Sequence, residues 1–213
     1  SFDHVAYIAL NSEYPWLTHV SNAESWSYSY GTALLSELPL VKTIQHTFQP
    51  SPPTLEKVLC SLKLKELLGG GSDFRMVDII SVHLDFSRQA VREKQIAEMR
   101  EILSARMNST IIMGDFNSEW LSDASVVKEL ATNSRFLTYK PEDKSYNTYK
   151  VKRLDWILIS KDLEFVNYRV FCSIYRSHIF SSIKNSTILL PEFPSPKGLL
   201  QSLFAFNIAF EHS

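Results

Sequence analysis

Polar residues of the types that handle phosphate groups and metal ions stand at the ends of short apolar segments. Strand ends direct side chains into a shared crevice, which is where active sites of α/β proteins usually form. The sequence therefore predicts one site assembled from several segments. The residues concerned are His83 and Asp85 after Val77–Val82, Asp115 and Asn117 after Ile111–Met113, and Asp155 within Leu154–Ile159.

Asp115 and Asn117 form the clearest pair. They stand two positions apart after an apolar segment, so they point to the same side while Phe116 turns back into the core. A carboxylate beside an amide can hold a hydrated divalent cation, orient a water molecule and donate to a phosphate oxygen. An ordinary Asp-x-Asn turn, with both side chains bonded to nearby backbone, explains the same pattern. The apolar segment before the pair favours the functional interpretation, because it would deliver both groups rigidly.

Asp155 is a carboxylate inside an apolar segment, where an ionised group is costly unless it is paired. Lys152 or Arg153 could pair with it. Alternatively, it could orient a histidine by holding one tautomer and stabilising the imidazolium. His178 is the later histidine nearest to it along the chain and is therefore the candidate partner.

His83 and Asp85 flank Leu84 at the end of another apolar segment. By itself, His83 fits a structural histidine whose ring bonds to a backbone carbonyl. Asp85 by itself fits a cap for the helix that follows. Their position at a strand end keeps His83 among the site candidates.

Length and composition limit the possible classes of protein. The chain has 213 residues, 45% of them hydrophobic, which suits one domain with a substantial core. A net charge of -1 gives no global field for a polyanion, so nucleic acid would need a local basic patch. Cys60 and Cys172 are too few for a disulfide framework. No apolar run approaches the roughly 18 residues of a membrane span, and no signal peptide opens the chain. Because it starts at Ser1, a preceding segment could carry a targeting signal, so the compartment is left unassigned.

The elements that position these residues follow from hydrophobic periodicity and turn signals. We predict a helix through Val5–Leu10 followed by a loop, and a hairpin connection at Gly69–Ser72. Ser87 is predicted to cap a helix from Arg88 to Ala105, with a second helix at Asp123–Ala131. Gly198–Phe210 could be a closing helix or a strand. The predicted strands are Tyr30–Ser36, Lys57–Lys65, Arg75–His83, Thr110–Met113, Tyr146–Tyr149, Leu154–Ser160 and Leu163–Val170, the last two joined by a turn at Ser160–Asp162.

Four of these segments resemble, in order, the motifs of the endonuclease/exonuclease/phosphatase superfamily. They are Tyr30–Ser36, Ser81–Asp85, Gly114–Asn117 and Leu154–Leu158. The resemblance implies a four-layer α/β sandwich of two packed mixed sheets flanked by helices, as a single domain over 1–213 with its motifs within 30–178. It also implies hydrolysis of a phosphate ester with Mg²⁺ or Mn²⁺.

The resemblance also implies a role for each matching residue. Asp115 would bind the metal and position the attacking water, and Asn117 would bind the phosphate. His83 would contact the phosphate and stabilise its developing charge. Asp155 would orient His178. These roles agree with phosphoryl chemistry, which needs positioned charge, a metal and an oriented water.

The chain departs from the superfamily pattern in three places. No Gln-Glu pair precedes Tyr30, and neither Glu13 nor Glu24 follows an apolar strand, so the expected main metal ligand is missing. Ser177 stands where the motif has an aspartate before the histidine. Glu37 follows Leu35-Ser36, where many members have a basic residue. In addition, the tail 184–213 is atypical, and this sandwich usually needs roughly 250 residues. We therefore expect an N-terminal truncation and weak turnover, with a non-catalytic, phosphate-binding relative as the alternative.

The identity of the substrate stays open, and the chain is expected to be a monomer acting on a phosphate ester. Tyr149 could stack on a substrate base or pack in the core, and Tyr146 and Trp156 have the same two interpretations. The basic run Lys144–Arg153 could meet an anionic substrate or form a solvated loop. Nucleic acid, phosphoinositide, phospholipid and small phosphate esters all remain candidates.

Overall fold

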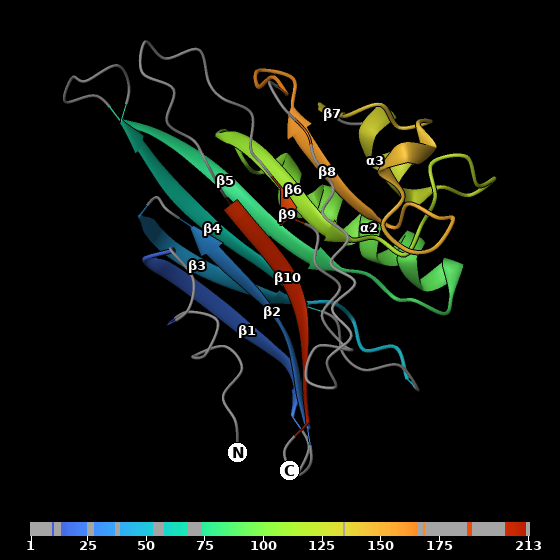
Figure 1. The fold of residues 1–213 in the computed structure, drawn as a ribbon, viewed down its shortest axis with the longest axis horizontal. Helices are drawn as coiled ribbons and strands as arrows, with labels where there is room; N and C mark the ends of the chain where they lie inside the picture. Colours follow the sequence, from blue (N-terminus) through green and yellow to red (C-terminus); the bar gives the residue numbers. More distant parts are fainter. Residues whose placement is uncertain are drawn as a thin grey trace.

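Two β-sheets packed face to face, with helices on one side, form the architecture (Figure 1). The computed structural model describes residues 10, 14–24, 28–36, 39–52, 58–67, 74–133, 135–165, 168, 187–188 and 203–211. None of the helices in these ranges is long and apolar enough to cross a membrane.

The larger sheet has six strands in the order β3-β4-β5-β6-β8-β7. β5 and β6 run parallel, and the other neighbouring strands are antiparallel, so the sheet is mixed. The strands are β3 (Leu40–Thr47), β4 (Val58–Leu67), β5 (Phe74–His83), β6 (Ser109–Asp115), β7 (Phe136–Thr138) and β8 (Asp155–Ser160).

The smaller sheet has four strands in the order β1-β2-β10-β9, antiparallel at every pairing. β10 lies between β2 and β9, which places part of the chain's last segment at the centre of this sheet. The strands are β1 (Trp16–Glu24), β2 (Tyr28–Ser36), β9 (Thr187–Ile188) and β10 (Leu203–Glu211).

Helices α2 (Gln89–Ser104) and α3 (Val126–Thr132) cover the outer face of the larger sheet (Figure 1). A 3₁₀ turn, η1 (Lys144–Tyr146), precedes β8. Ile96 and Met99 of α2 are fully buried in one cluster with Ile80 and Ile112 of the sheet. This packing of an apolar helix stripe, more than helix propensity, holds α2 in place.

A second core lies between the sheets and contains alternate residues of the central strands. Leu34 of β2 packs there with Ile79, Met113 and Ile157, whereas Ile80, Ile112 and Leu158 of the larger sheet pack in the cluster that contains the helix residues. Since strand residues alternate between faces, other odd-numbered residues of β5, β6 and β8, including His83, Asp115 and Asp155, also point toward the smaller sheet. That alternation determines where the polar residues at the strand ends project.

The predicted fold class is confirmed: two sheets pack together with helices outside. The mixed character holds for the larger sheet, whereas the smaller one is antiparallel throughout its described pairings. The segment Gly198–Phe210, which had two interpretations, forms a strand over Leu203–Glu211. Gly69–Ser72, where a hairpin connection was predicted, lies outside the described residues, and Leu67 and Phe74 on either side of it pair antiparallel.

Several predicted elements were wrong. The loop predicted before residue 29 is largely β1, and the helix at Val5–Leu10 lies outside the described residues except for Leu10. Tyr146–Tyr149 is the end of η1 and a tight turn, because its side chains do not alternate between two faces. Of the strand predicted at Leu163–Val170, residues 163–165 and Tyr168 are irregular, with Leu163 N–H donating to Ser160, and the other residues lie outside the described part of the chain. The second helix starts at Val126, capped by Ser125.

Candidate functional site

Three candidate residues lie in a row across three adjacent strands. His83 ends β5 and pairs in register with Asp115 at the end of β6, and Asp115 pairs with Asp155 at the start of β8. Partners in register project from the same face of a sheet, here the face toward the smaller sheet. His83 Nε2 lies 3.8 Å from Asp115 Oδ2, and the carboxylates of Asp115 and Asp155 are both buried. The fold thus places two carboxylates and an imidazole side by side.

Asn117 lies on the turn that follows Asp115. Its backbone N–H donates to Asp115 Oδ1 at 2.9 Å, and its amide Nδ2 donates to the carbonyl of Leu84 at 3.0 Å. The turn is therefore the Asp-x-Asn turn that the sequence allowed. Its left-handed backbone, with φ of 47°, is one that asparagine tolerates. The amide oxygen and the second hydrogen of Nδ2 still have capacity for a ligand.

Phe116, between these two residues, is fully buried in the core beside the helices, as predicted. Its backbone N–H donates to Leu154 O at 2.9 Å, and Leu84 N–H donates to Asp115 O at 2.9 Å. These bonds join the ends of β5, β6 and β8. The row of side chains is consequently held by backbone bonds as well as by strand register.

The two cations considered as partners for Asp155 are engaged elsewhere. Lys152 Nζ lies 3.1 Å from a carboxylate oxygen of Glu119. Arg153 is 4% exposed, donates to the carbonyls of Tyr139 and Lys140, and donates to the hydroxyl of Tyr168 at 2.8 Å. These contacts of Lys152 and Arg153 are with other groups, so they do not favour the interpretation in which one of the two cations pairs with Asp155.

Arg153 is the centre of an aromatic cluster that the sequence analysis missed. Its guanidinium lies 4.1 Å from the ring centroid of Trp156 and 5.1 Å from that of Tyr168. Burial lowers the pKa of Arg153 and raises the pKa of the Tyr168 phenol. Because those ordinary values lie far above neutrality, the arginine stays charged and the phenol stays neutral near pH 7. The cluster stiffens the chain directly before Asp155.

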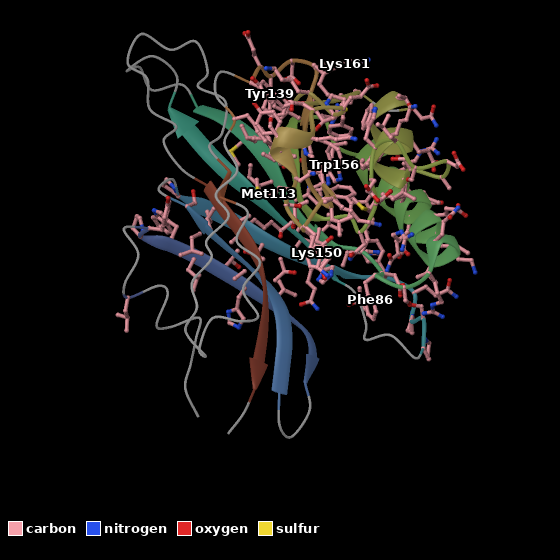
Figure 2. The ribbon with its side chains drawn as sticks, turned by 45° about the vertical axis from the view of Figure 1, so that its right-hand side comes forward. Phe86, Met113, Tyr139, Lys150, Trp156 and Lys161 are labelled. Atoms are coloured by element: carbon pink, nitrogen blue, oxygen red, sulfur yellow. The ribbon has the colours of Figure 1, made fainter. Side chains whose placement is uncertain are left out.

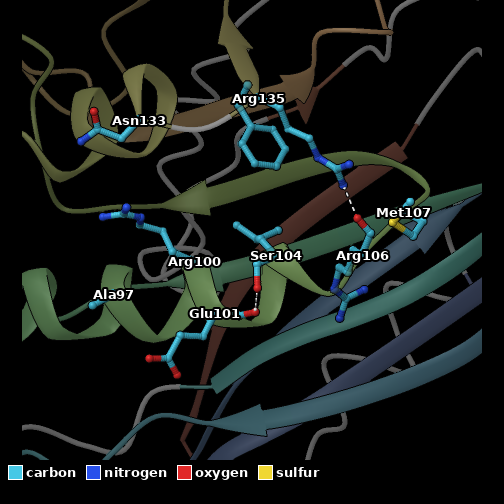
Figure 3. A pocket seen from close by; sticks show the side chains of 10 residues that line it. Ala97, Arg100, Glu101, Ser104, Arg106, Met107, Asn133 and Arg135 are labelled. Carbon is cyan, nitrogen blue, oxygen red and sulfur yellow. Dashed lines mark hydrogen bonds between the residues drawn. The ribbon is translucent and has the colours of Figure 1, made fainter.

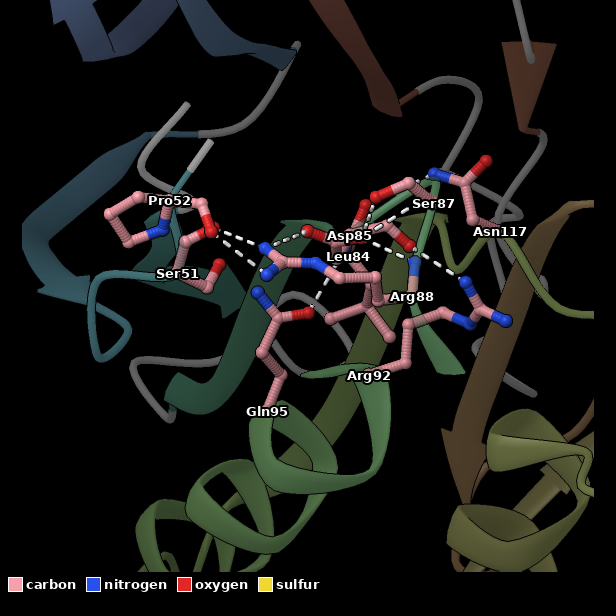
Figure 4. Close-up of polar contacts among 9 residues, drawn as sticks. All are labelled: Ser51, Pro52, Leu84, Asp85, Ser87, Arg88, Arg92, Gln95 and Asn117. Atoms are coloured by element: carbon pink, nitrogen blue, oxygen red, sulfur yellow. Dashed lines mark hydrogen bonds and ion pairs between the residues drawn. The ribbon is translucent and has the colours of Figure 1, made fainter. Parts of the chain in front are cut away.

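Asp85 anchors the entry to α2 (Figure 4). Its Oδ1 accepts from the backbone N–H groups of Ser87 and Arg88, both at 2.8 Å, and from the Ser87 hydroxyl. Its own N–H donates to the side chain of Gln95. The guanidinium of Arg88 extends the network to the carbonyls of Ser51 and Pro52. The predicted cap at Ser87 was wrong, since the buried carboxylate two residues earlier takes the available N–H groups.

Replacing Asp85 by alanine is expected to destabilise the protein by about 2 kcal/mol, at the upper end of the range for lost helix caps. The change leaves the part-buried N–H groups of Ser87 and Arg88 without this acceptor. Chemical denaturation followed by circular dichroism measures the loss. Asp85→Asn is the matched control, because it keeps Oδ1 as an acceptor and should recover at least half of the stability. Equal stability of the wild type and Asp85→Ala would show that the network contributes nothing.

The remaining candidates are placed differently. Trp156 is buried and packs against Trp120, which settles its interpretation as a core residue (Figure 2). Tyr149 is 41% exposed on a tight turn, where Lys150 Nζ lies 5.3 Å from its ring centroid. His178 and Ser177 lie outside the described residues. The candidate site therefore consists of His83, Asp115 and Asp155 at the strand ends, with Asn117 beside them.

A cavity of about 690 Å³ lies away from this row, between α2, the end of α3 and the start of β7 (Figure 3). Three of its lining residues are arginines, but each has a partner. Arg106 pairs with buried Asp78, Arg100 with Glu129, and Arg135 donates to backbone carbonyls. Since these guanidinium groups already have partners, the cavity is a weaker candidate than the strand-end row.

The donor set of the row matches what Mg²⁺ takes from a protein. Within the part of the chain that the structure describes, no group of three or more His, Cys, Asp and Glu side chains is placed to hold a metal. Mg²⁺ is commonly held by one or two carboxylates, with water and substrate phosphate completing its shell. Asp115 and Asp155, opposite each other in register, fit this sparse kind of site.

The overall architecture identifies the class of fold, although no protein-family model and no curated protein sequence matches the chain. The chain has the fold of the endonuclease/exonuclease/phosphatase superfamily, as its four motifs predicted. An endonuclease/exonuclease/phosphatase family protein from Bacteroides thetaiotaomicron matches with a TM-score of 0.52 at 10% identity, over 93% of this chain and 76% of that one.

Two further solved structures show the same likeness. Sphingomyelinase C from Streptomyces griseocarneus matches with a TM-score of 0.58 at 15% identity, over 98% of this chain and 80% of that one. The beta toxin from Staphylococcus aureus, as an F277A, P278A mutant with bound magnesium ions, has a TM-score of 0.57 at 16% identity, over 96% of this chain and 80% of that one. At these identities the likeness establishes the fold.

Proposed function

We propose that the protein hydrolyses a phosphate ester with Mg²⁺ or Mn²⁺ at the strand-end row. The observation that carries this proposal is the alignment of His83, Asp115 and Asp155 across three adjacent strands. Phosphoryl transfer depends mainly on positioned charge and an oriented nucleophile, which a rigid row of this kind supplies. The bound magnesium of the beta toxin structure and the phosphoesterase names among the similar folds agree with it.

Each residue of the row has a role that its surroundings suit. Asp115 accepts a hydrogen bond from Asn117 N–H through Oδ1, and its Oδ2 lies 3.8 Å from His83 Nε2, the side on which we place the attacking water. The imidazole of His83 donates to a phosphate oxygen and stabilises the charge that develops there. Asn117 donates to the phosphate through its remaining amide hydrogen.

The other assignments rest on the resemblance. Asp155 is proposed to orient His178, and Tyr149 to contact the group attached to the phosphate from its exposed turn. Asp115, with Asp155 beside it, would hold the metal. The metal would supply Lewis-acid polarisation of the phosphate and a lower pKa for a bound water.

Metal removal tests the proposal. The chain, incubated with bis-p-nitrophenyl phosphate and Mg²⁺, is expected to release p-nitrophenolate slowly but above the rate without protein. EDTA should return the rate to that background, and added Mg²⁺ or Mn²⁺ should restore it. Release of p-nitrophenolate is followed by absorbance at a pH where its phenolate absorbs. A rate that is indifferent to EDTA would contradict the metal-dependent mechanism.

A non-catalytic relative that binds phosphate is the second candidate. It is favoured by the two-carboxylate donor set and by Ser177 in place of the motif's aspartate. Inorganic phosphate would then raise the melting temperature through ligand binding to the native state, without any turnover. Metal-dependent hydrolysis contradicts this candidate, so the same preparation distinguishes the two functions.

A further inference from the structure

At the start of β8, within the described part of the chain, backbone N–H groups bond to a side chain and not to a neighbouring strand. β7 pairs with β8 only through Ser160, Ile159 and Leu158. On the described part of that edge, the first residues of β8 lie beyond the end of β7. Backbone donors at such a position need another acceptor, because an unsatisfied buried N–H group is costly.

Thr148 provides that acceptor. Its Oγ1 accepts from the backbone N–H of Leu154 and from the backbone N–H of Asp155, both at 3.1 Å. One hydroxyl oxygen therefore fixes two successive peptide groups at the point where β8 begins. The peptide group of Asp155 determines where its Cβ and carboxylate lie.

The threonine is itself held in place by a tight turn. Its N–H donates to Lys152 O at 3.0 Å, and Tyr149 and Lys152 exchange two backbone hydrogen bonds of 2.9 Å. The side chain of Lys152 also pairs with Glu119, on the loop that follows Asn117. The Thr148 hydroxyl thus belongs to a hydrogen-bonded turn whose backbone is fixed, so its two hydrogen bonds can fix the start of β8.

The bonded residues lead directly to the row. Leu154 N–H bonds to Thr148, while Leu154 O accepts from Phe116 N–H next to Asp115. Asp155 pairs in register with Asp115. We propose that Thr148 is a positioning residue, whose hydroxyl holds the start of β8 so that Asp155 stays aligned with Asp115 and His83. This inference rests on the proposed hydrolase function.

Thr148→Val tests the hydroxyl, because valine keeps the shape and removes the acceptor. The expected result is a fall in kcat of roughly 10–100-fold, since displacements of about 1 Å at a site can cost 10²-fold, with KM changed by less than about 3-fold. Thr148→Ser keeps the oxygen and should recover most of kcat. Thr132→Val, the same change at an exposed threonine on α3, should leave both constants unchanged.

Amide hydrogen exchange provides a readout that does not depend on turnover. In Thr148→Val the amides of Leu154 and Asp155 should exchange faster than in the wild type, while the amides of Ile157 and Leu158 keep their protection. Equal exchange in both proteins would overturn the proposal even if the chain proved inactive.

The possible outcomes separate this inference from the proposed function. A wild type without metal-dependent hydrolysis overturns the proposed function and, with it, the expected effect of Thr148 on kcat. An active wild type matched by Thr148→Val overturns the positioning role alone. Equal losses in Thr148→Val and Thr148→Ser would assign the effect to the threonine methyl group and would also overturn it.

Discussion

Asp115→Asn is expected to lower metal-dependent hydrolysis by roughly 10²–10⁴-fold, the range that a positioned proton-transfer group usually contributes. Asparagine keeps the size of the side chain and an oxygen that can accept from Asn117 N–H. It removes the negative charge that would hold a metal and orient the attacking water. The initial rate of p-nitrophenolate release under saturating Mg²⁺ measures the effect.

The matched control is Asp123→Asn, the same loss of charge at an exposed aspartate on the loop before α3. Its rate should equal that of the wild type. Circular dichroism of Asp115→Asn should show the native spectrum, because the hydrogen bond to Asn117 survives. An Asp115→Asn variant that keeps more than about a tenth of the activity would show that the carboxylate has no such catalytic role.

The positions of the row could be predicted because they depend on short-range signals. The short apolar segment Ile111–Met113, bounded by Gly114, is typical of a buried strand, and residues at its end are expected where the strand leaves the core. The same reasoning places His83 at the end of its strand, whereas Asp155, predicted inside Leu154–Ser160, is the first residue of β8. That β5, β6 and β8 lie next to one another in register depends on how the sheet assembles. The order of the sequence motifs did not specify that register.

Strands without a buried alternating face could not be predicted. β3 is an edge strand with most of its side chains exposed, including Val41 and Ile44, so its residues do not alternate between apolar and polar. The choice between two candidate caps for α2 could not be made from the sequence. Ser87 and Asp85 are both good capping types, and only the buried position of Asp85 decides which one accepts the backbone N–H groups.

Thr148 and Arg153 could not be recognised from the sequence either. A threonine in a polar loop has many partners available, and its acceptor role depends on where β8 begins in three dimensions. Arg153 in a basic run suggested a solvated or ligand-binding charge. Its place among Tyr139, Tyr168 and Trp156 depends on how the loop folds back. Contacts between loops and strand ends are tertiary properties.

Gly114→Ala is expected to cause the largest loss of stability among single changes in β6. Gly114 has φ of +141°, a backbone conformation that side-chain-bearing residues rarely adopt. A Cβ atom there would lie 1.9 Å from the carbonyl oxygen of Val82. That oxygen belongs to β5, whose position is fixed by its neighbours in the sheet, so it cannot move aside at low cost.

Strained backbone and overpacking each cost about 1–3 kcal/mol, so a loss of about 3 kcal/mol or more is expected. For a chain of this size, that loss lowers the melting temperature by about 6–12 °C. Thermal unfolding followed by circular dichroism measures it. Met107→Ala, at a residue 90% exposed, is the control and should melt like the wild type.

The two substitutions at adjacent positions separate architecture from chemistry. Gly114→Ala pushes β6 away from β5, so it should weaken both the fold and the contact between His83 and Asp115. Asp115→Asn should leave the melting temperature near that of the wild type and remove only the activity. A melting temperature of Gly114→Ala within about 2 °C of the wild type would contradict this prediction. It would show that the close approach of β6 to Val82 does not require glycine at this position.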